Sequence, residues 1–447
     1  MSLFDIQSTA LSCVKCGKCI PDCTIYQVNR DETTSPRGFL DLLGAYKAGH
    51  LPLDKTSKNI FESCFLCTTC VQNCPSSLPV DTAIESVRID IARKFGISWY
   101  KRLYFFLLRH RRLADVVFAC VGFIAPCLFK GDTTKLRLPI KRSVFPFAKK
   151  SFLQKYGTPL PDIEANKPQP PIAESNSQAI ESSAQNTESA PSTTKRRVAI
   201  FIGCLANYNY TNVGESLLKI LNTLDIEAFV PKFQECCGAP AFFTGDIRTV
   251  TTLIKRNIEY FERFWESIEA MIIPEATCAA MIKVDWKHAL ELGEEAEESK
   301  KWIERLERLL PKIFMTSEWL DAHTDLAMRL DNGVRADYVI TYHDPCHARK
   351  VLGVYKQPRA LLAKNFTINE MSDCSRCCGF GGISMQSSNY TLTLKAGIPK
   401  AQSIHASGAQ VVSAECGACR MQLTNALDSI NSPVRVLHPL ELLADKL

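Results

Sequence analysis

Two short cysteine runs near the amino terminus constrain this chain more than any other feature. The segments CVKCGKCIPDC and CFLCTTCVQNCP both follow the spacing C-x2-C-x2-C-x3-C. That spacing is typical of bacterial ferredoxins, whereas zinc sites use pairs of cysteines on separate loops. The runs therefore predict two 4Fe–4S electron-transfer clusters in a helical, ferredoxin-like domain over residues 1–92.

In a double run of this kind, three cysteines bind one cluster and the fourth binds the other cluster. The expected ligands of the first 4Fe–4S cubane are Cys13, Cys16, Cys19 and Cys74. The expected ligands of the second cubane are Cys64, Cys67, Cys70 and Cys23. One departure is that Thr24 follows Cys23, where the ferredoxin pattern usually has proline.

The whole chain of 447 residues contains 20 cysteines, an unusual number for this length. Disulfides would explain it in a small secreted domain, but the segment MSLFDIQSTALSC lacks the basic and apolar parts of a secretory signal. We therefore expect a cytoplasmic protein whose cysteines bind metal or take part in redox chemistry.

The rest of the chain divides by composition into four further segments. Residues 93–158 are basic and aromatic, and residues 159–196 are rich in Pro, Ser, Asn, Gln and Glu. The second of these has too few large apolar residues to offset the entropy of ordering, so it is predicted to be a disordered linker. Residues 197–330 and 331–447 return to globular composition and are predicted to form two lobes.

The two predicted lobes have the pattern of an internal duplication. VAIFIGC parallels YVITYHDPC, QECCG parallels SRCCG, and MIIPEATC parallels QVVSAEC. The offsets are 142, 141 and 138 residues, measured from Cys204 to Cys346, Cys237 to Cys378 and Cys278 to Cys416. Short apolar strands alternate with helical stretches, which predicts an α/β lobe with a parallel sheet. Ligands of open α/β sheets bind at the carboxyl ends of strands, where these cysteines are expected.

Each lobe repeats a single cysteine, an adjacent pair followed by glycine, and a terminal cysteine. The set in the second lobe is Cys346, Cys377, Cys378, Cys416 and Cys419. The set in the first lobe is Cys204, Cys236, Cys237 and Cys278, with Met281 at the second cysteine position of the last C-x2-C. Five thiolates exceed what one tetrahedral zinc binds and suit a cluster of several irons. Gly238 and Gly379 would let the backbone turn tightly beside it.

These motifs resemble the cysteine-rich CCG domains of heterodisulfide reductase. Over nearly the whole chain, apart from the linker, the sequence resembles the cysteine-rich iron–sulfur component of anaerobic glycerol-3-phosphate dehydrogenase, and the iron–sulfur subunit of glycolate oxidase shares the architecture. The segments that carry the likeness are GCLANYNYTNVGESLLKILN, ECCGAP, YHDPCH, RCCGFGG, ECGACRMQL and HPLELLADKL. The resemblance implies a non-cubane 4Fe–4S cluster in the second lobe. For the first lobe, a cluster, a zinc ion and no metal all stay open.

The resemblance also implies an electron-transfer subunit of a membrane-associated dehydrogenase. Neither a G-x-G-x-x-G nor a P-loop motif is present, so substrate oxidation is expected on a partner subunit that contains FAD. Electrons from glycerol 3-phosphate, or from glycolate or lactate in the alternative, would pass to a quinone. Two other functions stay open, a disulfide reductase acting at the second-lobe cluster and a scaffold stabilised by zinc. His343 and His347 flank Cys346, and each could either hydrogen-bond a cluster sulfur or be a structural histidine.

The positive charge of the chain is concentrated in residues 93–150, which contain 14 Lys and Arg against two acidic residues. The best apolar stretch there is 17 residues long, short of the ~20 that a membrane-spanning helix needs. One interpretation is a set of helices lying on the inner face of the cytoplasmic membrane, and the other is a hairpin that packs the two halves together. Nothing else resembles a nucleic-acid module, so nucleic acid is not an expected partner. The remaining cysteines are Cys120 and Cys127, expected to pack as small apolar side chains, and Cys374, which is expected to pack but could also be a cluster ligand.

Overall fold

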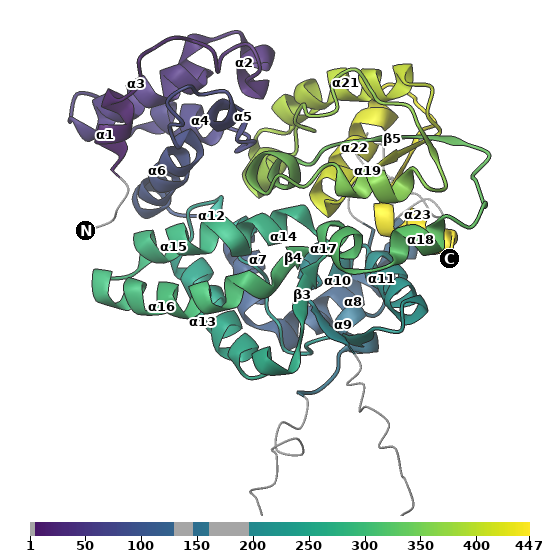
Figure 1. Ribbon diagram of the computed structural model, residues 1–447. Coiled ribbons are helices and arrows are strands. Elements are labelled where there is room, and N and C mark those ends of the chain that lie inside the picture. The colour runs from purple at the N-terminus through teal and green to yellow at the C-terminus, as the bar shows by residue number, and fades with distance from the viewer. Residues whose placement is uncertain (1–4, 129–145, 161–195) are drawn as a thin grey trace, which may run out of the picture.

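The computed structural model describes residues 5–128, 146–160 and 196–447 of the chain (Figure 1). The predicted linker, apart from its ends, and residues 129–145 of the basic segment lie outside the described residues, as does the side chain of Cys127. The described residues form a helical amino-terminal domain, two α/β lobes, and helices of the basic segment that pack against the lobes.

The amino-terminal domain is helical, as the ferredoxin-like pattern predicted. Its core contains the fully buried side chains of Phe61 and Leu43. The helix α3 begins where the Ser35 hydroxyl accepts a hydrogen bond from the Gly38 amide (2.9 Å) and proline occupies the first turn. Its helical elements are α1 (Ile6–Leu11), α2 (Thr24–Asn29), η1 (Glu32–Thr34), α3 (Pro36–Lys47), α4 (Lys55–Glu62), α5 (Thr69–Gln72) and α6 (Val80–Phe95).

The basic segment forms α7 (Trp99–Arg109), α8 (Arg111–Leu128) and the short α9 (Phe152–Tyr156). Phe105 of α7 is buried in the apolar core of the first lobe, and Lys101 donates a hydrogen bond to Ser384 Oγ of the second lobe (2.8 Å). The helix α7 therefore packs the two halves together, as one of the two interpretations proposed. Among the described residues, no helix is long and apolar enough to cross a membrane.

Each lobe contains a four-stranded parallel sheet, and the two sheets have the same strand order. The first sheet has the order β2-β1-β3-β4 and the second the order β6-β5-β7-β8. Because β1 corresponds to β5 and β3 to β7, the topology confirms the internal duplication. The strands are β1 (Arg197–Ile200), β2 (Glu227–Phe229), β3 (Ala270–Ile273), β4 (Ile313–Met315), β5 (Val339–Tyr342), β6 (Thr367–Ile368), β7 (Val411–Ser413) and β8 (Arg435–Leu437).

Helices follow the strands in both lobes and cover the sheets. Those of the first lobe are α10 (Gly203–Tyr208), α11 (Thr211–Thr223), α12 (Ala239–Phe242), α13 (Ile247–Glu262), η3 (Trp265–Ser267), α14 (Ala276–Ala280), η4 (Met281–Asp285), α15 (Trp286–Gly293), α16 (Ala296–Leu309), η5 (Leu310–Lys312), α17 (Thr316–His323) and α18 (Leu326–Leu330). Those of the second lobe are η6 (His347–Val351), α19 (Gln357–Leu362), α20 (Gly382–Ser388), α21 (Tyr390–Ala406), α22 (Gly417–Ser429) and α23 (Pro439–Asp445).

The two lobes meet at the carboxyl ends of their central strands. The Ala276 amide donates a hydrogen bond to the Glu415 carbonyl (2.9 Å), and the Gly417 amide donates to Glu275 Oε2 (2.7 Å). The amino-terminal domain lies against both lobes at this junction (Figure 1). Arg88 of α6 joins it to the first lobe by donating to the Phe243 carbonyl (2.9 Å). Both sets of strand tips and the ferredoxin-like domain are thus brought to one region of the molecule.

Candidate metal centres

The eight amino-terminal cysteines lie in two groups that match the crossed ferredoxin pattern. One pocket is lined by Cys13, Cys16, Cys19 and Cys74, and a second pocket by Cys23, Cys64 and Cys67. Cys70 lines both pockets. Burial raises the pKa of Cys23 to about 12, and the nearby thiols of Cys67 and Cys64 add to that rise. Binding a metal here would release these protons.

The possible metal-ligand atoms of the second lobe lie close together. A tetrahedral zinc, with Zn–S bonds of ~2.3 Å, draws its sulfurs to roughly 3.8 Å from one another. Within the described residues, one set of three potential ligand atoms lies within 4.8 Å of one another, and it consists of His343, Cys378 and Cys419. This compact set belongs to the second lobe, whereas for the ferredoxin-like groups it is the C-x2-C-x2-C-x3-C spacing and the dicluster cysteine pattern that indicate 4Fe–4S clusters.

The five predicted cysteines of the second lobe gather at the carboxyl ends of β5 and β7. Cys346 immediately precedes η6, Cys416 immediately precedes α22, and Cys419 lies in the first turn of α22. The sulfurs of Cys378 and Cys419 are 3.3 Å apart, and Cys377 contacts both Cys346 and Cys378. All five side chains are at least nine-tenths buried.

Gly379 makes the turn beside the cysteine pair possible. Its φ is +85°, a conformation that favours glycine. A Cβ at this position would lie 2.9 Å from the Ala396 Cβ and 3.0 Å from the Thr393 carbonyl oxygen. Any larger residue would therefore displace α21 from the site.

His343 adds an imidazole to the second-lobe site. The residue is fully buried, and neither ring nitrogen makes a regular hydrogen bond among the described residues. Burial, together with the charge of Lys400, lowers its pKa, which keeps the ring neutral at pH 7. A neutral imidazole has one N–H donor and one acceptor nitrogen, so it can donate to a metal-bound sulfur or bind a metal itself.

The four predicted cysteines of the first lobe gather in the corresponding place. Cys204 lies in α10, the pair Cys236 and Cys237 precedes α12, and Cys278 lies in α14. The thiols form three close contacts, Cys204 with Cys236, Cys236 with Cys237, and Cys237 with Cys278. Gly203 lies so close that an added Cβ would be 2.8 Å from Cys278 Sγ.

The expectation that Met281 replaces a missing ligand is wrong. Met281 is fully buried in the apolar core at the start of η4. The helix starts give a different correspondence, because Glu275 precedes α14 as Cys416 precedes α22. Cys278 therefore corresponds to Cys419, and Glu275 stands at the position of Cys416. The segment EATC carries this signal, since it has the spacing of C-x2-C with glutamate in the first place.

Glu275 belongs to the junction between the lobes as well as to the first-lobe site. Its side chain is 3% exposed, and burial raises the pKa of its carboxyl to about 7. Oε2 accepts the hydrogen bond from the Gly417 amide, whereas Oε1 has no hydrogen-bond partner in the described part of the chain. The first-lobe site thus has four thiols and one carboxyl, compared with five thiols in the second lobe.

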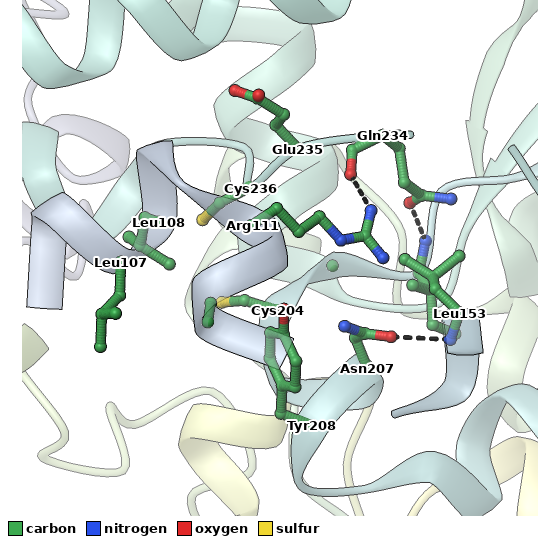
Figure 2. Close-up of a pocket in the computed structure, with 13 residues that line it drawn as sticks. Leu107, Leu108, Arg111, Leu153, Cys204, Asn207, Tyr208, Gln234, Glu235 and Cys236 are labelled. Carbon is green, nitrogen blue, oxygen red and sulfur yellow. Dashed lines mark hydrogen bonds between the residues drawn. The ribbon is translucent and has the colours of Figure 1, made fainter. Parts of the chain in front are cut away.

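Helices α7 and α8 cover the first-lobe thiols. Figure 2 shows Cys204 and Cys236 beside a narrow pocket whose apolar wall includes Leu108. Arg111 of α8 closes one side by donating hydrogen bonds to the carbonyls of Lys232 (3.0 Å) and Gln234. The basic segment therefore borders the first-lobe site directly.

Two contacts join the cysteine groups to one another. A hydrogen bond with Cys377 of the second lobe is the largest influence on the Cys67 thiol and lowers its pKa. Thr277, the neighbour of Cys278 in the first lobe, has its hydroxyl 3.5 Å from Cys416 Sγ of the second lobe. The second-lobe group therefore lies between the ferredoxin-like groups and the first-lobe group.

His347 and the cysteines outside the predicted motifs, Cys120 and Cys374, lie outside the four thiol groups. The His347 ring stacks on Phe243 at 5.8 Å, and its Nδ1 lies 3.2 Å from the Thr277 hydroxyl, so it packs at the lobe junction. Cys374 is half-buried near Arg349. Cys120 is exposed, which contradicts the expectation that it packs as an apolar side chain.

Comparison with known proteins agrees with this arrangement. Residues 198–283 and 340–424 match the family described as a cysteine-rich domain (CCG), and residues 9–78 match the 4Fe–4S dicluster domain. The chain is 25% identical over 450 residues to a probable glycolate oxidase iron–sulfur subunit of Bacillus subtilis, a match that covers 97% of this chain and 93% of that protein. It is 28% identical over 250 residues to lactate utilization protein A of Bacillus cytotoxicus, covering 55% of this chain and 98% of that protein. Its four cysteine groups and these domain matches identify the chain as a CCG-domain iron–sulfur protein.

Proposed function

We propose that this protein is the electron-transfer subunit of a membrane-associated 2-hydroxy-acid dehydrogenase. An FAD-containing partner would oxidise the substrate, and a quinone would accept the electrons. The observation that carries the proposal is the unbroken series of cysteine groups, joined by the contacts Cys67 to Cys377 and Thr277 to Cys416.

The residues of each group would hold a cluster that accepts and releases one electron at a time. The ferredoxin-like groups would hold two 4Fe–4S cubanes, the second lobe a non-cubane 4Fe–4S cluster, and the first lobe a cluster bound by four thiolates. The fold holds the cysteine groups close to one another. It also keeps water away from the second-lobe thiols, which are at least nine-tenths buried. That burial favours electron transfer over disulfide reduction, since a disulfide substrate would have to reach these sulfurs.

The names of the relatives favour a 2-hydroxy acid as the substrate of the partner. One relative is named for glycolate and the others are named for lactate utilization. The expectation of glycerol 3-phosphate finds no support in these names. Glycolate and lactate share a carboxylate beside a hydroxyl-bearing carbon, so one kind of flavin site could oxidise either.

The exposed faces of α7 and α8 support a position on the membrane surface. Trp99 and Phe123 are 71% and 77% exposed. Exposed apolar side chains with interspersed arginines suit the headgroup region of an anionic membrane. The others on these helices are Leu103, Phe106, Leu113, Val116 and Ile124, with Arg102 and Arg112. Since the same helices border the pocket beside Cys204 and Cys236, we assign quinone reduction to the first lobe.

The substrate is tested by purifying the tagged full-length chain from its own host without oxygen, together with the flavoprotein that accompanies it. We expect lactate or glycolate to reduce the complex and to produce the EPR signals of reduced clusters. Reduction by glycerol 3-phosphate alone would overturn the proposed substrate class. The absence of any flavoprotein partner would overturn the proposed function.

The membrane surface is tested with the full-length chain and lipid vesicles. We expect binding to vesicles that contain anionic lipid, and weaker binding after the double change Trp99→Ser and Phe123→Ser. Met328, which is 73% exposed on α18, offers a matched control as Met328→Ser. Equal binding of all three proteins would contradict a role of α7 and α8.

A further inference from the structure

Lys350 lies where the ferredoxin-like domain meets the second lobe. It belongs to η6, one turn after Cys346, and its Nζ donates a hydrogen bond to the Thr69 hydroxyl of the other domain. The Thr69 hydroxyl lies 3.3 Å from Cys67 Sγ. One ammonium group is thereby linked to a cysteine of each domain, at the contact between Cys67 and Cys377.

The charges around Lys350 come from sulfur and not from carboxylates. Its neighbour Arg349 pairs with Asp344, which also binds Arg359. Among the residues that the structure describes, Lys350 has no such ion pair. Its electrostatic partners are the thiols of Cys346, Cys67, Cys377 and Cys70. A partly buried cation without a carboxylate is stable when another anion faces it, and thiolates that bind iron are such anions.

We propose that Lys350 is a positioning residue shared by two redox sites, one in each domain. The first site is the group that contains Cys67, and the second is the second-lobe group that contains Cys346 and Cys377. The inference rests on the proposed electron-transfer function. It identifies the residue that acts where electrons cross between the ferredoxin-like domain and the second lobe. Reduction of either site adds one negative charge, which the ammonium stabilises, so Lys350 raises the reduction potential of both sites. Because one charge acts on both sites, it shifts the two reduction potentials in the same direction. It also holds the domains in contact while one electron passes from one site to the other, and no proton is moved.

The test is a redox titration of the full-length chain, purified without oxygen, with chemical mediators and EPR detection. We expect Lys350→Met to lower the reduction equilibrium constants of both sites by about tenfold, equivalent to about 59 mV for a one-electron couple. Lys350→Arg keeps the charge, so its potentials should stay near those of the unchanged protein. Lys395, exposed on α21, is the matched control as Lys395→Met and should shift neither potential.

Iron content checks that the variants are loaded. If Lys350→Met lost iron, Thr69→Val would provide the second test, because it removes only the hydroxyl between Nζ and Cys67. We then expect a smaller fall in the potential of the ferredoxin-like site alone. Unchanged potentials in loaded Lys350→Met, or a shift equal to that of Lys395→Met, would overturn the proposal. The titration needs no flavoprotein, so its failure is distinct from failure of the proposed function.

Discussion

The two lobes share a fold and differ in the residues at two corresponding positions. Cys416 of the second lobe is matched by Glu275 in the first. His343 of the second lobe is matched by Phe201, because each donates its amide to the next strand, His343 to Ser413 and Phe201 to Ile272. The second-lobe site thus has five thiols and an imidazole, whereas the first-lobe site has four thiols and a carboxyl, with Phe201 at the backbone position of His343. The two lobes therefore share a scaffold, whereas the residues at these corresponding positions differ.

The cysteine groups of the two lobes also have different surroundings in the molecule. The second-lobe group contacts the ferredoxin-like domain through Cys377 and the first lobe through Cys416. The first-lobe group instead borders α7, α8 and their pocket (Figure 2). A fully buried site between two others suits internal transfer of electrons, and a site beside a pocket suits their exit to an acceptor.

The largest effects are expected from removing one cysteine of each pair. Cys378→Ser should lose about four iron atoms per chain and the EPR signal of the second-lobe site. Electron transfer to a quinone analogue should stop, because the series is broken at its centre. Cys237→Ser should lose the first-lobe iron while the ferredoxin-like and second-lobe signals remain. Full iron content in Cys237→Ser would show that the first lobe holds no cluster.

The second prediction makes the first lobe resemble the second. Glu275→Cys supplies the fifth thiol at the position of Cys416, so we expect a first-lobe EPR signal closer to that of the second lobe. Glu275→Gln is the control, since it keeps an acceptor for the Gly417 amide and adds no thiol. Identical spectra and iron contents in the two variants would contradict the correspondence of Glu275 with Cys416.

The third prediction makes the second lobe resemble the first. His343→Phe removes the imidazole that lies near Cys378 and Cys419 and introduces the side chain that Phe201 has in the first lobe. Hydrogen bonds to sulfur raise the reduction potential of an iron–sulfur site. We therefore expect the second-lobe potential to fall, with a several-fold decrease in the reduction equilibrium constant. The first-lobe potential should not change. A loaded variant with an unchanged second-lobe potential would show that His343 is only a packing residue.

Much of this architecture could be predicted from the sequence, because the cysteine spacing and the strand pattern are local signals. The ferredoxin-like groups, the duplication and both CCG groups follow from repeated motifs. The Glu275 correspondence was missed because Cys278 was aligned with Cys416, although the segment EATC has the C-x2-C spacing with glutamate in the first place. The helix starts reveal the correct register. The partners Thr69 and Lys350 could not be found, since their residues are 281 positions apart and nothing in a sequence pairs them.

The smallest predicted effect concerns the pH dependence of the lobe junction. His438 is fully buried, and its Nε2 lies 2.9 Å from the Pro274 carbonyl of the first lobe. Burial, together with the charge of Arg420, lowers its pKa to about 3. An unfolded histidine titrates near pH ~6.5, so below that pH only the unfolded chain takes up the proton, and stability is lost as pH falls.

At pH 5.5 this loss should be about 1.4 kcal/mol relative to pH 8. His438→Gln keeps a donor for Pro274 but does not titrate, so its anaerobic unfolding midpoint should fall less than that of the unchanged protein between pH 8 and 5.5. The exposed His405 of α21 is the matched control, and His405→Gln should leave the pH dependence as it is. The same acid sensitivity in His438→Gln would show that another group causes the pH dependence of stability. The next residues to vary would then be Arg420 and Glu441, which form a largely buried ion pair beside His438.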